Sequence, residues 1–183
     1  IDGQSGNDTI HGNDGNDTLL GGDGADEITG DDQNDIIDGG DDGDSLEGGF
    51  GQDTIRGGRE ADTISGDADA DLIYGDEGDD DLTGLDGDDR ISGGPGDDVL
   101  TGETGADYLV GDAGDDLLDG GNGNDRLYGK DGNDPFGGND GLNQAKLVAA
   151  GPVQVHASGF RNPYDLVIMK SAPHAGRMYS FDN

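Results

Sequence analysis

The nine residues GGDGADEIT at positions 21–29 decide the fold of this chain, because their pattern recurs without interruption on both sides. From residue 3 to residue 137 the sequence divides into fifteen units of nine residues, with no insertion or deletion. Every unit begins with Gly, carries Asp at its sixth position and has an apolar residue at its eighth. Three fixed columns over fifteen units indicate one structural unit stacked many times.

The eighth position predicts the hydrophobic core. Side chains alternate between the two faces of a strand, so a three-residue strand centred on this position buries its middle side chain and exposes the two neighbours. One buried side chain per strand requires two sheets that face each other. We expect odd units to supply one inner face through Ile10, Ile28, Leu46, Ile64, Leu82, Leu100, Leu118 and Phe136, and even units to supply the other through Leu19, Ile37, Ile55, Ile73, Ile91, Leu109 and Leu127.

The sixth position predicts a metal site in every turn. Stacking places each Asp over the Asp two units later, as with Asp8 over Asp26, where like charges repel. A hard cation with 6–8 oxygen ligands fits between two such turns, bound by one carboxylate from each and by main-chain carbonyls. The absence of Cys and the scarcity of His oppose zinc, copper and iron, and Mg²⁺ requires a smaller octahedron. The predicted Ca²⁺ ligands are Asp8, Asp17, Asp26, Asp35, Asp44, Asp53, Asp62, Asp71, Asp80, Asp89, Asp98, Asp107, Asp116, Asp125 and Asp134.

The charge of the chain indicates that the metal is essential for folding. Residues 1–137 carry 40 acidic and 5 basic side chains, a difference of −35, and the whole chain carries −34. About thirteen Ca²⁺ ions would cancel about 26 of these charges, so binding energy becomes folding energy. We predict a disordered, extended chain without calcium and a rigid roll with it. Such a polyanion is no partner for nucleic acid, and no stretch approaches the roughly 18 apolar residues of a membrane span.

These residues resemble the RTX, or haemolysin-type, calcium-binding repeats, whose consensus is G-G-x-G-x-D-x-U-x. Units 21–29 and 120–128 match the consensus in full. The resemblance implies an all-β fold, a right-handed parallel β-roll or β-solenoid in which two units make one coil, with G-G-x-G-x-D as the turn and x-U-x as a short strand. It also implies a secreted bacterial protein, exported unfolded by type I secretion, that folds on Ca²⁺ outside the cell or at its surface.

Four turns depart from the consensus at the fourth position, where Gln33, Asp42, Glu60 and Asp69 replace Gly. A positive φ at these positions would be strained for a residue with a side chain. Two interpretations remain open for residues 30–74. These turns bind calcium more weakly, or the added carboxylates replace carbonyl ligands.

The repeat predicts two domains, a roll over residues 1–137 and a non-repeat tail over residues 138–183. Ile1 and Asp2 occupy the eighth and ninth positions of an earlier unit, so we expect the chain to be a piece of a longer solenoid. Pro135 removes a ladder donor at the other end, and the roll should stop near residue 140. The tail has strand-like apolar runs at 145–150, 153–156, 166–169 and 178–181.

Within the tail, VHASGFRNPYDLVI at 155–168 and GRMYSFDN at 176–183 resemble a blade region of the soluble glucose and sorbosone dehydrogenases. These are six-bladed β-propellers that use pyrroloquinoline quinone (PQQ). The resemblance implies that Arg161 and Asn162 would line the quinone. Alternatively, the tail caps the open end of the roll by adding a strand.

Three functional interpretations remain open. The leading one is a calcium-binding module of a secreted bacterial protein, acting as a rigid scaffold or secretion module. In the second, the chain is an inactive fragment of a secreted PQQ-dependent sugar dehydrogenase that carries an RTX roll. In the third, it is a component of a calcium-dependent surface layer, filament or adhesin, assembling through the roll ends or acidic faces. We expect no catalysis by this chain, because identical Asp residues in every unit serve no single reaction.

Overall fold

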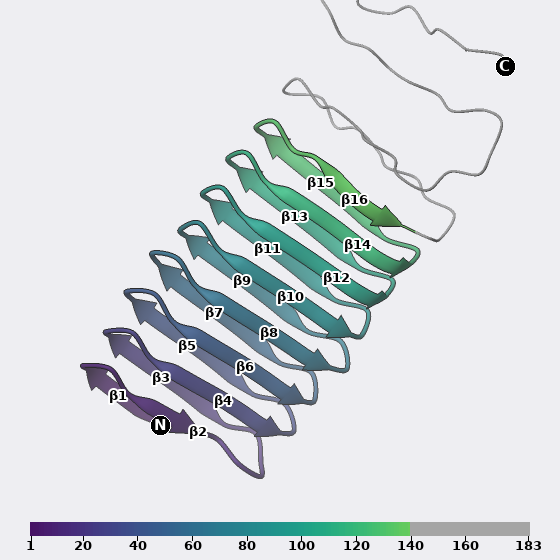
Figure 1. Cartoon of the computed structure of the whole chain (residues 1–183). Helices are drawn as coiled ribbons and strands as arrows, with labels where there is room; N and C mark the ends of the chain where they lie inside the picture. Colours follow the sequence, from purple (N-terminus) through teal and green to yellow (C-terminus); the bar gives the residue numbers. More distant parts are fainter. Residues whose placement is uncertain (140–183) are drawn as a thin grey trace, which may run out of the picture.

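A computed structural model describes residues 1–139 of the chain, which wind into a flattened solenoid of two parallel β-sheets (Figure 1). Successive strands alternate between the sheets, so each strand pairs in parallel with the strand two places along. The odd-numbered strands form one eight-stranded sheet, here called the odd sheet, and the even-numbered strands form the even sheet. Among residues 1–139, no helix has the length and apolar character needed to cross a membrane.

The two sheets have the same construction. The odd sheet contains β1 (Asp2–Ser5), β3 (Thr18–Asp23), β5 (Ile36–Asp41), β7 (Thr54–Arg59), β9 (Leu72–Glu77), β11 (Arg90–Pro95), β13 (Tyr108–Ala113) and β15 (Arg126–Asp131). The even sheet contains β2 (Thr9–His11), β4 (Glu27–Asp32), β6 (Ser45–Phe50), β8 (Thr63–Ala68), β10 (Asp81–Asp86), β12 (Val99–Gly105), β14 (Leu117–Gly123) and β16 (Phe136–Asn139).

The eighth-position side chains form the core between the sheets, as predicted. Fourteen of them, from Ile10 to Leu127, make one buried cluster, and none is more than 8% exposed. The assignment of odd and even units to opposite inner faces is confirmed. Ile28 and Leu46, from odd units, pair in register in the even sheet, whereas Leu19 and Ile37, from even units, pair in the odd sheet. The eighth position of the last unit, residue 136, takes the matching place beside Leu118 in the backbone register.

The strands are longer than the three residues expected from the repeat. Most run for six residues, from the seventh position of one unit to the third position of the next, as in β4 and β6. Their burial alternates so that the eighth-position side chain and the following first-position Gly both face inward. A β-carbon on Gly21 would meet the Oδ2 atom of Asp26 and the carbonyl oxygen of Gly39, so these glycines make room for the Asp column.

The second position of every unit turns the chain through a left-handed backbone conformation. Six units have Gly there, but nine have a residue with a side chain, including Leu85 (φ 74°) and Lys130 (φ 73°). The prediction of positive φ at the fourth position is also confirmed, with values of 79° at Gln33, 74° at Asp42, 65° at Glu60 and 77° at Asp69. The solenoid therefore imposes this geometry whether or not the sequence supplies Gly.

Replacing Asp69 should separate the two interpretations of these departing turns. Asp69 is exposed, and its charge lies close enough to Asp53 to raise the pKa of that carboxyl. Because Gly adopts positive φ without strain, we expect Asp69→Gly to raise the free energy of unfolding in calcium by about 1 kcal/mol, measured by denaturant titration. Asp69→Asn is the control, since Asn tolerates this conformation and removes only the charge. A loss of bound calcium in Asp69→Gly would show instead that the carboxylate is a ligand.

Candidate metal centre

The sixth-position Asp residues form two continuous hydrogen-bonded columns, one along each edge of the roll where the chain passes between the sheets. The main-chain N–H of each Asp donates to Oδ1 of the Asp eighteen residues later, as from Asp71 to Asp89 and from Asp80 to Asp98. Thirteen such bonds, with N–O distances of 2.7–3.1 Å, run from Asp8 to Asp134. The predicted stacking of Asp8 over Asp26 is therefore confirmed.

The second carboxylate oxygen, Oδ2, of nearly every Asp in these columns is buried and has no hydrogen-bond partner. This holds for Oδ2 of fourteen of the fifteen predicted ligands, the exception being Asp17 near the N-terminal end. The thirteen Asp residues from Asp26 onward are at most 4% exposed. A buried charged oxygen without a partner costs several kcal/mol, so fourteen of them in one small roll require a compensating charge. The columns fit a row of hard cations.

The remaining ligands have to come from the main chain. In the described range of residues 1–139, no three Asp, Glu or His side chains converge on one point that could hold a metal. Each turn instead offers one carboxylate beside Gly-rich backbone, with the carbonyl oxygen of Gly39 and Oδ2 of Asp26 both next to Gly21. Carboxylate and carbonyl oxygens in a flexible arrangement suit Ca²⁺ rather than metals that prefer nitrogen or sulfur. When bound, the ions would supply positive charge that bridges neighbouring turns.

Burial raises the pKa of the twelve sixth-position Asp carboxyls from Asp35 to Asp134. Desolvation is the largest cause, and the neighbouring Asp charges of the same column add to it, while the main-chain hydrogen bond to Oδ1 opposes it. The pKa reaches about 6 at Asp53, about 7 at Asp62 and Asp98, and about 8 at Asp71. The highest of these values, at Asp71, lies near the middle of the roll.

These shifts predict that acid partly replaces calcium. An Asp whose pKa is raised from 3.8 to about 6–8 in the roll binds more protons folded than unfolded. Its contribution therefore favours the metal-free roll at low pH and is lost as the pH rises through about 6–8. In chelator, we expect circular dichroism to show more β-structure at pH 5 than at pH 8.5. Equal spectra at the two pH values in chelator would contradict the burial of these carboxyls.

The structure also contains a second ladder that the fixed columns did not predict. At the fifth position, Oδ1 of Asp79 accepts from the N–H of Asp97, Oδ1 of Asp97 from Asp115, and Oδ1 of Asp115 from Asn133, at 2.8–2.9 Å. These bonds run in the opposite direction to the sixth-position ladder and lie at the surface. Their sequence signal is the recurrence of Asp or Asn every eighteen residues, which a nine-residue comparison overlooks.

The other predicted site lies outside the described residues. Arg161 and Asn162, assigned to PQQ by resemblance, fall in the tail beyond residue 139. The quinone site, the cap interpretation and the domain boundary at residues 137 and 138 stay predictions.

A two-sheet parallel roll whose edges align buried carboxylates between Gly-rich turns defines a calcium-binding repeat protein. Eight overlapping segments match the RTX calcium-binding nonapeptide repeat, and together they cover residues 1–134, so the chain belongs to this family. The segments are 1–28, 11–46, 20–55, 38–73, 47–82, 74–109, 83–118 and 101–134. A search of curated protein sequences gives no match to the chain. Residues 1–134 are therefore a calcium-binding repeat module.

Proposed function

We propose that this chain is the calcium-folded scaffold module of a secreted bacterial protein, which crosses the cell envelope unfolded and becomes rigid outside the cell. Its fifteen sixth-position Asp residues would bind the ions, each ion shared between units two apart. The observation that carries this proposal is the row of fourteen buried Oδ2 atoms without partners. Membership of the RTX repeat family supports it, because these repeats are typical of secreted bacterial proteins.

The difference in calcium concentration between the cytosol and the outside of the cell would determine where the chain folds. Extracellular calcium modules bind at about 10⁻⁴–10⁻³ M, far above the calcium level of the cytosol. A metal-free roll would hold two columns of unneutralised carboxylates at a spacing of about 4.8 Å per strand, so repulsion would keep the chain open inside the cell. Outside the cell, bound ions would join each turn to the next and produce a rod of fixed length.

The calcium midpoint of folding tests this proposal. We expect circular dichroism at pH 7.5 to show cooperative gain of β-structure between about 10⁻⁴ and 10⁻³ M free Ca²⁺. Mg²⁺ at the same concentrations should produce little change, because it holds its water ligands more tightly. A midpoint below about 10⁻⁷ M would place folding inside the cell and refute the proposal, even if the module binds calcium.

Assembly into a surface layer or filament is a second candidate function. The observation that favours it is an unequal distribution of charge, because all five Lys and Arg residues of the described range lie in strands of the odd sheet and none lies in the even sheet. In this function the rod itself would be the building block of the layer or filament.

A further inference from the structure

The two outer faces of the roll differ in charge. Strands of the odd sheet contain all five Lys and Arg residues of the described range, and also its three Tyr residues. Those strands carry eight Asp or Glu residues, so their net charge is 5 − 8 = −3. Strands of the even sheet carry nine Asp or Glu residues and no Lys or Arg, which gives −9. Arg and Tyr are the residue types that concentrate at protein interfaces, and here both lie on one face.

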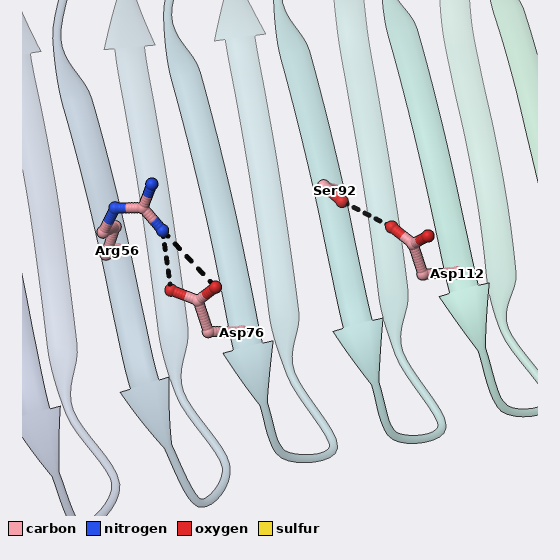
Figure 2. Close-up of polar contacts among 4 residues, drawn as sticks. All are labelled: Arg56, Asp76, Ser92 and Asp112. Carbon is pink, nitrogen blue, oxygen red and sulfur yellow. Dashed lines mark hydrogen bonds and ion pairs between the residues drawn. The ribbon is translucent and has the colours of Figure 1, made fainter.

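Three of the five bases are already paired within the odd sheet. Arg56 on β7 donates to Asp76 on β9 at 3.1 Å, as Figure 2 shows, and Arg59 donates to Asp41 at 2.8 Å. Lys130 pairs with Asp112, whose other carboxylate oxygen accepts from the Ser92 hydroxyl (Figure 2). The Arg56–Asp76 pair joins a ninth to a second position, Arg59–Asp41 joins two third positions, and Lys130–Asp112 joins two second positions.

The other two bases, Arg90 and Arg126, form no ion pair with any residue of the described range. Both are exposed at outward-facing seventh positions, on β11 and β15. Tyr108 on β13 lies between them in the same register and is 39% exposed, and its ring lies 5.1 Å from that of Tyr128. Arg90, Tyr108 and Arg126 are here called the Arg–Tyr–Arg row. Its two Arg residues are two strands, or about 9.6 Å, apart.

The even sheet carries a matching row of opposite charge. Asp67 on β8, Leu85 on β10 and Glu103 on β12 are adjacent in register at second positions. They are here called the Asp–Leu–Glu row. Its two carboxylates are also two strands apart, so their spacing equals that of Arg90 and Arg126. Leu85 occupies the middle place, as Tyr108 does in the other row. Because every copy of the roll has the same strand spacing, each residue of one row can lie opposite one residue of the other row.

We propose that the odd sheet of one copy docks on the even sheet of a second copy, with the Arg–Tyr–Arg row against the Asp–Leu–Glu row. Arg90 would face Asp67, Arg126 would face Glu103, and Tyr108 would pack on Leu85. In this register six strands of each face overlap, spanning about 24 Å along the roll, and each strand is about 20 Å long. The contact therefore covers about 480 Å² per partner, below the roughly 800 Å² of a standard interface and in the range of weak association. Such a contact joins different faces, so it leaves each copy with one free face and extends into an open row of rolls.

This inference depends on the proposed calcium-dependent folding, because the rows exist only in the folded roll. Sedimentation velocity of the full chain at millimolar Ca²⁺ and about 50 mM NaCl tests it. We expect species larger than a dimer to grow with protein concentration, and to dissociate at about 0.5 M NaCl because the contact is electrostatic. Circular dichroism of the same samples reports folding. A folded chain that stays monomeric at all concentrations overturns the docking inference alone, whereas a chain that stays unfolded in calcium overturns the proposed function.

Charge reversal identifies the faces. The variants R90E/R126E and D67K/E103K should each remain folded and lose self-association at least tenfold. An equimolar mixture of the two should regain it, because each reversed face meets a reversed partner. The matched control R56E/R59E makes the same charge change on the odd sheet away from the row, and should retain most self-association. Association that persists in R90E/R126E, or a mixture that stays monomeric, overturns the inference. So does a monomeric wild type that binds added poly-glutamate, since its partner would then be another acidic molecule.

Discussion

Removal of calcium at pH 7.5 is expected to abolish the β-structure of the chain. At this pH the Asp carboxyls of the unfolded chain are ionised. Folding would bury fourteen carboxylate oxygens that have no hydrogen-bond partner, so the roll cannot form without cations that compensate their charge. We expect circular dichroism in excess EDTA to show an unfolded spectrum. Small-angle scattering should give a radius of gyration of roughly 45 Å or more, the value for an unfolded chain of this length. Added Ca²⁺ in excess of the chelator should reverse both changes.

The control for chelation is ionic strength. Monovalent salt at about 1 M screens repulsion between exposed charges but cannot bridge two buried carboxylates. The EDTA-treated chain should therefore stay unfolded in NaCl. A compact chain with strong β-signal in EDTA at pH 7.5 would mean that the core alone sustains the roll, and the cation would then be accessory.

Substitution of one central Asp is expected to remove about two bound ions. In Asp89→Asn the amide oxygen can still accept the hydrogen bond from the Asp71 N–H, so the ladder survives and only the charge of Oδ2 is lost. If each ion is shared by units two apart, Asp89 serves one ion with Asp71 and another with Asp107. We expect affinity at both sites to fall by at least about tenfold, the scale of losing even an outer partner of a metal ligand. Equilibrium dialysis measures the stoichiometry.

The matched control for this substitution is Asp81→Asn. Asp81 lies on the adjacent strand β10 and is exposed, so the substitution removes the same charge without touching the column. Its calcium stoichiometry should equal that of the wild type. If the two variants bind calcium equally, the sixth-position column does not ligate the ions.

Most of the fold and the column were predictable because they depend on single positions of the repeat. An apolar eighth position fixed Ile28 and Leu46 on one inner face, and an invariant sixth position fixed Asp8 over Asp26. The outer-face pairs were not predictable in this way. Arg56 and Asp76 are twenty residues apart, which is one coil of eighteen plus two, and a comparison of columns within nine residues never brings them together.

Positive φ at the second position escaped prediction for a different reason. Leu85 and Lys130 have side chains that disfavour positive φ, yet both adopt it because their neighbours in the stack impose the bend. The stacking of the coils therefore overrides the backbone preference of the individual residue. The reason for an invariant Gly at the first position was likewise not visible in the sequence: at Gly21 it leaves space for the carboxylate of Asp26.

The eighteen-residue coil sets a rule for how such a chain can grow or shrink. Loss or gain of two units removes or adds one strand from each sheet and leaves every later residue on its original face. Loss of a single unit, such as residues 57–65, would preserve each turn and the apolar core but transfer all later strands to the opposite sheet. Arg90 and Arg126 would then share a face with the carboxylates of β4 and β6, while the later strands of the even sheet would join the face of β1 to β7. A single-unit change therefore leaves the fold intact but exchanges the two outer faces of the roll downstream of the change, whereas a change of two units preserves both the fold and the faces.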